Sequence, residues 1–177
     1  MLNRGVKMCC FNHLWASLHG TLYEGISVHM TELKKLASVA DILEREAGPT
    51  IMEWLRRVNL IPELTGIPLS DMDRAGHLPK LFQDLIYRLR LLKDAPSPVS
   101  AFAAAHGAVR WGQGYTAPML VDESRLFEVA TFGTLHIHQN ELDRKHVLLD
   151  VMVIADEVDA QLVETVRSLM GAKVCRG

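Results

Sequence analysis

The chain has 177 residues, of which 49% are hydrophobic and 23% charged, and its formal net charge is -2. This length suits one domain with a single hydrophobic core, and this composition argues against a largely disordered chain. The charge shows no basic excess of the kind that marks a nucleic-acid-binding surface, so nucleic acid is not an expected partner.

Cysteine usage and hydropathy indicate the compartment. The cysteines, Cys9, Cys10 and Cys175, are odd in number and two are adjacent, which disfavours a disulfide framework. No stretch approaches the roughly 18 apolar residues of a membrane helix, and the start of the chain lacks the apolar region of a signal peptide. We therefore expect a cytoplasmic protein that does not contact a membrane.

Helical patterning begins near Thr31. Residues 1–29 mix aromatic residues and glycines without a period, which predicts a poorly ordered, dispensable extension. Apolar residues then recur at helical spacing from Leu33 to Leu43, and again from Ile51 to Val58. Gly48-Pro49 predicts an interruption or a kink between these two stretches.

Three more helices are predicted in the middle of the chain. Residues 60–77 contain prolines and glycines and indicate an irregular linker. An apolar stripe from Leu81 to Leu92 then predicts a helix that opens near Leu78. An alanine-rich helix over Ser100–Gln113 follows, and another begins at Pro118.

The last predicted helix begins at Asn140 or Asp143 and is capped by Gly171. Its apolar residues step by three or four, as in a coiled-coil seam, and are Leu148, Met152, Ala155, Val158, Leu162, Val166 and Leu169. Such a stripe either pairs with its copy in a dimer or packs on its own bundle. Together the elements predict an all-α bundle of about five to six helices, with a domain over residues 30–171 and a tail over 172–177.

The most informative segment runs from His106 to Tyr115. It contains Gly107, Gly112 and Gly114, and glycine in a helix interior costs about 1 kcal/mol relative to alanine. Gly107 and Gly112 would let two helices approach closely. Gly114 suits the left-handed conformation that ends a helix.

A turn near residues 114–117 would make the two flanking helices antiparallel. Arg110 would then lie level with Asp122 or Glu123, and we expect a buried or half-buried ion pair with one of these carboxylates. The alternative is that Arg110 points into solvent. Such a pair would stabilise little by itself, but the loss of one partner would be costly.

Neither a metal site nor catalysis is predicted. Three histidines that are close in sequence match no metal-binding spacing, namely His136, His138 and His146. No Gly-x-Ser-x-Gly elbow, Walker loop or dinucleotide-binding fingerprint is present. We therefore expect a protein that is not an enzyme and that has no metal and no other cofactor.

The segment HGAVRWGQGYTAPMLVDESRLF resembles the N-terminal domain of RsbRD-type proteins, the stressosome co-antagonists. Related domains precede the kinase cores of some bacterial sensor histidine kinases. The residues that match the family pattern are His106, Gly107, Arg110, Gln113, Gly114, Tyr115, Glu123 and Arg125. Glu53-Trp54-Leu55 and Leu78-Pro79 also look like family motifs, and the resemblance covers about Met30 to Gly171.

The resemblance implies a non-catalytic input domain of bacterial stress or two-component signalling, which relays a signal through its C-terminal helix to a downstream or partner domain. The expected partners are a second copy of the chain, in a homodimer, and a signalling kinase or an anti-sigma-antagonist protein. The alternative is a small-molecule-binding helical protein. Its pocket would lie around the His106–Tyr115 hairpin, lined by His106, Trp111 and Tyr115.

Overall fold

The structure is a computed structural model that describes residues 36–91 and 99–174. The described residues fold into helices, and their one extended pairing is an isolated bridge between Ala37 and Leu142. The predicted all-α fold is therefore confirmed. The helices are α1 (Val39–Arg45), α2 (Ala47–Val58), α3 (Pro62–Thr65), α4 (Asp71–Ala75), α5 (Leu78–Arg90), α6 (Ala101–Gly112), α7 (Ala117–Ile137) and α8 (Val147–Val174).

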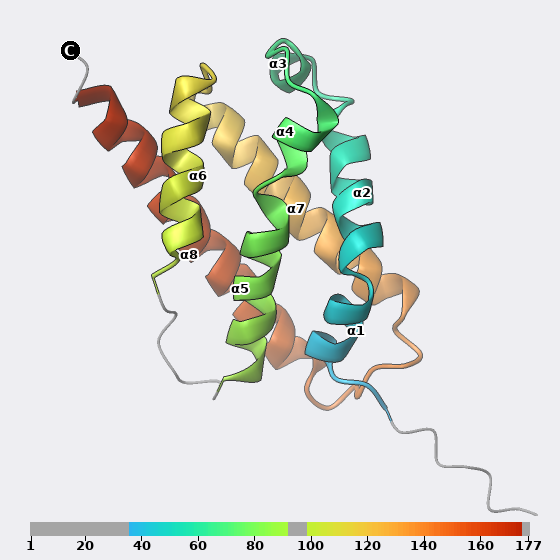
Figure 1. The fold of residues 1–177 in the computed structure, drawn as a ribbon. Coiled ribbons are helices and arrows are strands. Elements are labelled where there is room, and N and C mark those ends of the chain that lie inside the picture. The colour runs from blue at the N-terminus through green and yellow to red at the C-terminus, as the bar shows by residue number, and fades with distance from the viewer. Residues whose placement is uncertain (1–35, 92–98, 175–177) are drawn as a thin grey trace, which may run out of the picture. The chain divides into compact units, whose positions relative to one another are not determined.

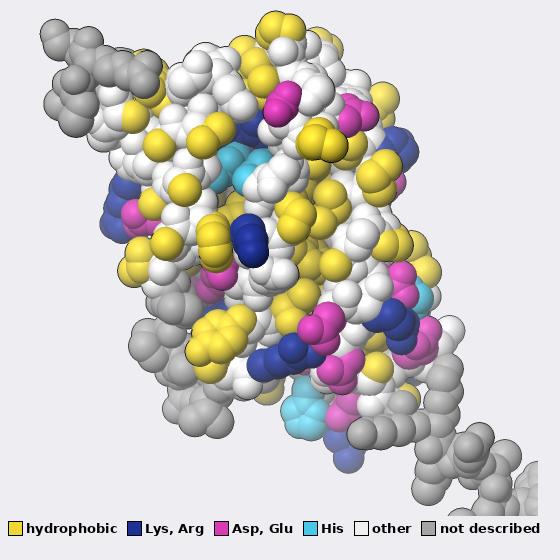
Figure 2. All heavy atoms as spheres, in the orientation of Figure 1, with side chains coloured by type: hydrophobic (Ala, Val, Ile, Leu, Met, Phe, Trp, Pro, Cys, Tyr) yellow, Lys and Arg dark blue, Asp and Glu magenta, His cyan; other side chains and the backbone are white. Residues whose placement is uncertain are grey.

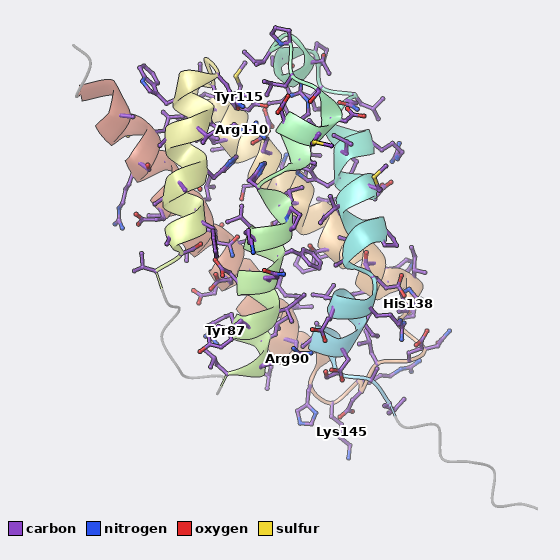
Figure 3. All side chains as sticks on the ribbon, viewed as in Figure 1. Tyr87, Arg90, Arg110, Tyr115, His138 and Lys145 are labelled. Carbon is purple, nitrogen blue, oxygen red and sulfur yellow. The ribbon has the colours of Figure 1, made fainter. Side chains whose placement is uncertain are left out.

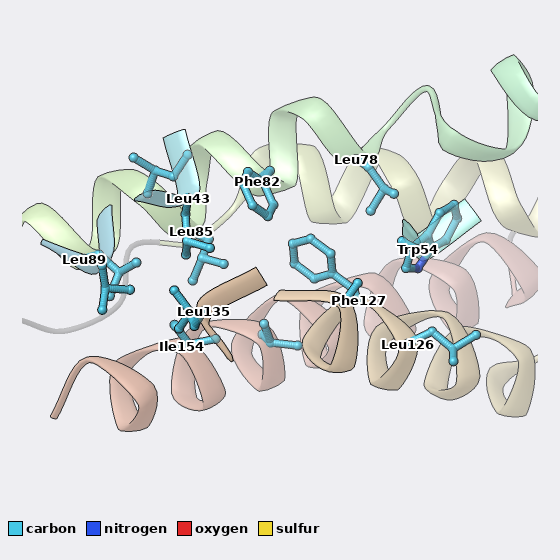
Figure 4. Packing of buried hydrophobic residues seen from close by; sticks show 14 of the residues in the cluster. Leu43, Trp54, Leu78, Phe82, Leu85, Leu89, Leu126, Phe127, Leu135 and Ile154 are labelled. Carbon is cyan, nitrogen blue, oxygen red and sulfur yellow. The ribbon is translucent and has the colours of Figure 1, made fainter. Parts of the chain in front are cut away.

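The helices of the unit that begins at Leu36 pack in two layers (Figure 1). The long helices α7 and α8 cross behind α2, α5 and α6 in this view. Apolar side chains from the two layers meet between them, and the Phe82 and Phe127 rings lie edge to face at 5.6 Å (Figure 4). None of the described helices combines the length and the apolar character needed to span a membrane.

The first helix begins later than its sequence pattern predicts. Ser38 Oγ accepts a hydrogen bond from Asp41 N at 3.2 Å, and the Asp41 carboxylate accepts one from Ser38 N at 3.4 Å. This capping box starts α1 at Val39, so Leu36 precedes the helix and is 50% exposed. The predicted start at Thr31 and the predicted extension over residues 1–29 lie outside the described residues.

The structure differs from the sequence prediction at Gly48-Pro49 and in the linker over residues 60–77. Gly48-Pro49 does not interrupt a helix, because it falls in the first turn of α2, where proline removes no helical hydrogen bond. The break comes two residues before Gly48, at Glu46. The irregular linker predicted over residues 60–77 contains α3 and α4, and Ser70 Oγ caps α4 by accepting from Asp73 N at 3.1 Å.

The bounds of α5, α6 and α7 agree with the sequence patterns, whereas those of α8 do not. Lys145 N donates to Asp143 Oδ1 at 3.1 Å in a turn that precedes the helix, so α8 starts at Val147. Gly171 does not cap α8, because the helix continues to Val174. The predicted domain limit at residue 171 therefore falls inside α8.

The predicted seam of α8 is divided between solvent and the core. Leu148 and Met152 are 72% and 61% exposed, whereas Val158 and Leu169 are buried. The other three positions are partly buried, and they are Ala155, Leu162 and Val166. A straight α-helix drifts about 20° per heptad from a 3.5-residue repeat. The prediction of one continuous seam is therefore wrong.

Candidate functional site

Polar side chains gather inside the bundle near the turn between α6 and α7, where Figure 3 labels Arg110 and Tyr115. We call this cluster the polar centre, and it comprises Arg74, His77, His106, Arg110, Tyr115 and Glu123. Five of these residues are buried, and His77 is partly buried. Burial of so many polar groups is costly unless they bond to one another.

The centre is built on an ion pair between α6 and α7. Arg110 Nε donates to Glu123 Oε2 at 3.1 Å, and Arg110 Nη2 donates to Glu123 Oε1 at 2.9 Å. Gly114, with φ at 88°, makes the turn that brings the two helices together. The predicted pairing with Glu123 is confirmed. Asp122 lies instead at the surface, 3.6 Å from Arg125, which places Arg125 outside the polar centre.

Arg110 also binds other neighbours. Nη1 donates to Gln113 Oε1 at 2.8 Å, and Nη2 donates to the backbone oxygen of Arg74 at 2.6 Å. The guanidinium also lies 4.5 Å from the centre of the Tyr115 ring. Arg110 therefore connects α6 to α7 and to the end of α4.

A second buried guanidinium, that of Arg74, enters the centre from α4. It donates to the backbone oxygens of Leu64 and Ile67, at 2.9 and 2.8 Å, and to the Tyr115 hydroxyl at 3.1 Å. The Tyr115 hydroxyl in turn donates to Glu123 Oε1 at 2.9 Å. The carboxylate of Glu123 thus binds Arg110 directly and is linked to Arg74 through the Tyr115 hydroxyl. Sequence reasoning missed Arg74, since nothing in its local pattern distinguishes it from a surface arginine.

Two histidines stack at the edge of this network. The rings of His77 and His106 lie 3.6 Å apart at an interplanar angle of 12°. His106 Nε2 is 3.5 Å from Glu123 Oε2, and His77 Nδ1 is 3.4 Å from Arg110 Nη2. Trp54 lies edge-on to His77 and donates from Nε1 to the backbone oxygen of Glu123 at 3.0 Å.

Burial sets the protonation of the centre. It lowers the pKa of His77 well below its usual value, and nearby His106 and Arg110 lower it further. Burial also lowers the pKa of His106, against an opposing effect of Glu123. The pKa of Tyr115 is raised to about 12, chiefly by burial and then by Glu123. At neutral pH both imidazoles are uncharged, and Tyr115 keeps its proton.

The arrangement is poorly suited to a metal ion. Ligand atoms of His77, His106 and Glu123 lie within 4.8 Å of one another. However, stacked imidazole rings do not direct their nitrogens to a common point, and both oxygens of Glu123 already bind Arg110. The histidines for which no metal site was predicted lie outside the polar centre. Partly buried His138 pairs with Glu141 at 2.9 Å, and exposed His146 pairs with Asp143 at 2.8 Å.

Two hollows adjoin the histidine stack. A narrow cavity of about 30 Å³, lined by His77, His106 and Glu123 among others, has room for little more than a water molecule. A surface groove of about 390 Å³ runs between α6 and the α4–α5 segment. Both histidines line the groove, and Figure 2 shows histidine side chains in a hollow of this face.

The pocket predicted from the hairpin is only partly correct. His106 lines both hollows, but Trp111 and Tyr115 line neither. Trp54 and His77 take their places beside His106 in the cavity. Trp54 belongs to a segment that the family resemblance singled out, but its contact with the hairpin was not predicted.

The predicted small-residue contact exists at Gly107 and not at Gly112. A Cβ atom at Gly107 would lie 2.1 Å from the backbone oxygen of Thr165, on α8, whereas one at Gly112 would meet nothing within 4 Å. Thr165 Oγ1 also donates to the backbone oxygen of Ala103 at 3.1 Å. The close approach is therefore between α6 and α8, one residue after His106.

Comparisons of the chain with protein-family models, with curated proteins and with solved structures found no match. The residues and contacts above are therefore the basis for inferring function.

Proposed function

We propose that this protein is a non-catalytic signalling input domain of bacterial stress or two-component signalling. In this proposal the polar centre receives the signal, and α8 relays it to a downstream or partner domain in the cytoplasm. The resemblance of the hairpin to the RsbRD-type N-terminal domain supports this proposal. Its matching residues Arg110, Gln113, Tyr115 and Glu123 bond to one another rather than facing solvent separately.

The observation that carries the proposal is the backbone contact between Gly107 and Thr165. His106 precedes Gly107 directly, so a movement of the histidine stack displaces the part of α6 that touches α8. Gln161 adds a second connection, because its Nε2 donates to the backbone oxygen of Leu81, on α5, at 3.2 Å. α8 therefore contacts two of the elements that position the polar centre. Packed helices transmit such shifts as rigid elements.

The polar centre favours relay over catalysis. A general base needs an accessible lone pair, but both oxygens of Glu123 bind Arg110, and its side chain is 4% exposed. Of the two hollows beside the polar centre, Glu123 lines only the cavity of about 30 Å³, which does not admit an organic substrate. These groups are arranged to hold three helices together.

A kinase chimera tests the signalling role. The full chain would be joined, in helical register after α8, to the catalytic core of a bacterial histidine kinase. Glu123→Gln, which leaves Arg110 without its anion, should change the autophosphorylation rate several-fold. Asp122→Asn, on the same helix but 40% exposed, should not change it. Equal rates in the two variants and the parent would contradict the proposal.

A further inference from the structure

The groove between α6 and the α4–α5 segment has the size and the walls of a small-molecule site. Its volume of about 390 Å³ falls in the range of known ligand pockets. Three apolar side chains that line it are exposed: Met72 at 82%, Phe102 at 45% and Val109 at 56%. An apolar molecule seated here would shield all three from water.

The polar groups of the groove are mainly hydrogen-bond donors. Gln113 Oε1 is taken by Arg110, which leaves the Gln113 amide nitrogen without an acceptor among the described residues. Lys80 Nζ lies 5.5 Å over the Phe102 ring and has no carboxylate partner in the described part of the chain. The carboxylate of Asp73, at the rim, accepts from Ser70 Oγ at 2.6 Å.

The positive charge behind the groove is only partly neutralised. Arg74 and Arg110 are 3% and 1% exposed, and the carboxylate of Glu123 binds Arg110 directly but Arg74 only through the Tyr115 hydroxyl, while the stacked imidazoles are neutral. The polar centre therefore carries a net positive charge. A buried charge is costly unless an opposite charge lies nearby. An anion in the groove would supply it, because Arg110 lines the groove and keeps one Nη1 hydrogen without an acceptor among the described residues.

We propose that this groove binds a small organic acid with an apolar body. The carboxylate binds Lys80 and Gln113, in front of the buried guanidinium of Arg110, and the apolar body lies against Met72, Phe102 and Val109. The inference names the class of effector for the proposed input domain. It rests on that proposed function for its biological role, although binding itself does not depend on it.

The test is a titration of the isotope-labelled full chain followed by amide chemical shifts, with benzoate and octanoate as probes and benzamide as the uncharged control. We expect saturable shifts, at roughly millimolar concentration for ligands of this size, in residues 72–80 and 102–113. Benzamide should bind at least several-fold more weakly. No saturable shifts with either acid, or equal binding of benzamide, would overturn the proposal.

Two exposed methionines provide a matched pair of variants. Met72→Glu places a negative charge at the groove rim and should weaken acid binding by about fivefold, the effect of like charges a few ångströms apart in water. Met52→Glu makes the same change on α2, where Met52 is 64% exposed and outside the groove, and should leave binding unchanged. Equal affinity in the two variants would place the acid elsewhere and overturn the proposal.

Binding and relay can fail separately. Groove shifts without a change in hydrogen exchange along α8 would support the acid site and contradict the input function. A response of α8 to changes in the polar centre, without acid binding, would support the input function and contradict the acid site.

Discussion

Glu123 of α7 accepts hydrogen bonds from two nitrogens of Arg110 on α6, at 3.1 and 2.9 Å. The side chains of Glu123 and Arg110 are 4% and 1% exposed. Desolvation offsets much of the attraction in such a buried pair, so the pair itself contributes little stability. The cost of removing one partner is much larger than the stability that the intact pair contributes. Once both groups are buried, removing either one leaves the other with an unmatched charge and unfilled hydrogen bonds.

Arg110→Ala should therefore lower the free energy of unfolding by about 3–5 kcal/mol, as for other broken buried pairs. Urea unfolding followed by circular dichroism measures the loss. The double variant with Glu123→Ala should recover part of it, because no carboxylate is then left unpaired. Asp122→Ala serves as the surface control and should change stability by less than about 0.5 kcal/mol. Strictly additive single-variant effects would contradict the pairing.

Two glycines of α6 give a second matched pair. Gly107→Ala would push a Cβ atom to 2.1 Å from the Thr165 oxygen, so the helices must separate, at a cost of about 1–3 kcal/mol. A Cβ atom at Gly112 would meet nothing within 4 Å, so Gly112→Ala should be neutral or slightly stabilising. Thermal unfolding of both variants checks the difference. Equal stability would mean that α6 and α8 are not in close contact at Gly107.

The sequence predicted what depends on local spacing. The Arg110–Glu123 pair follows from a short turn at Gly114, and the starts of α5, α6 and α7 follow from nearby proline and serine signals. The remaining polar centre depends on long-range packing. Arg74 meets Tyr115 across 41 positions, and Trp54 meets Glu123 across 69. No periodicity within a helix encodes such a meeting, so these partners could not be identified from the pattern.

The histidine stack predicts a stability loss in mild acid. Because the native pKa values of His77 and His106 lie below the unfolded value of 6.5, the unfolded chain binds more protons as pH falls below 6.5. The stability that the neutral imidazoles provide is complete above that value. It is lost toward the lower native pKa values, by about 1.4 kcal/mol per pH unit for each histidine.

Urea midpoints between pH 7.5 and pH 5 measure this dependence. His77→Gln should flatten the curve, because it removes one of the two buried imidazoles. A parent protein whose stability is independent of pH across this range would show that the imidazoles are not buried in neutral form.

The exposed start of α8 is the place where we expect the proposed homodimer contact. Leu148 and Met152 are 72% and 61% exposed, whereas Leu162 packs against the core. Leu148→Glu with Met152→Glu should give a folded monomer by light scattering. Leu162→Glu should instead destabilise the whole domain, by about 2 kcal/mol or more. A parent protein that is monomeric at high concentration would exclude the dimer.

Hydrogen exchange along α8 tests the central claim, that the polar centre is coupled to the relay helix. In Glu123→Gln, amides from Gln161 to Met170 should exchange about tenfold faster than in the parent, corresponding to local opening cheaper by about 1.4 kcal/mol. Amides of α1 should change far less, and Asp122→Asn should leave both regions unchanged. Faster exchange confined to the α6–α7 turn, or an equal increase throughout the chain including α1, would contradict the coupling.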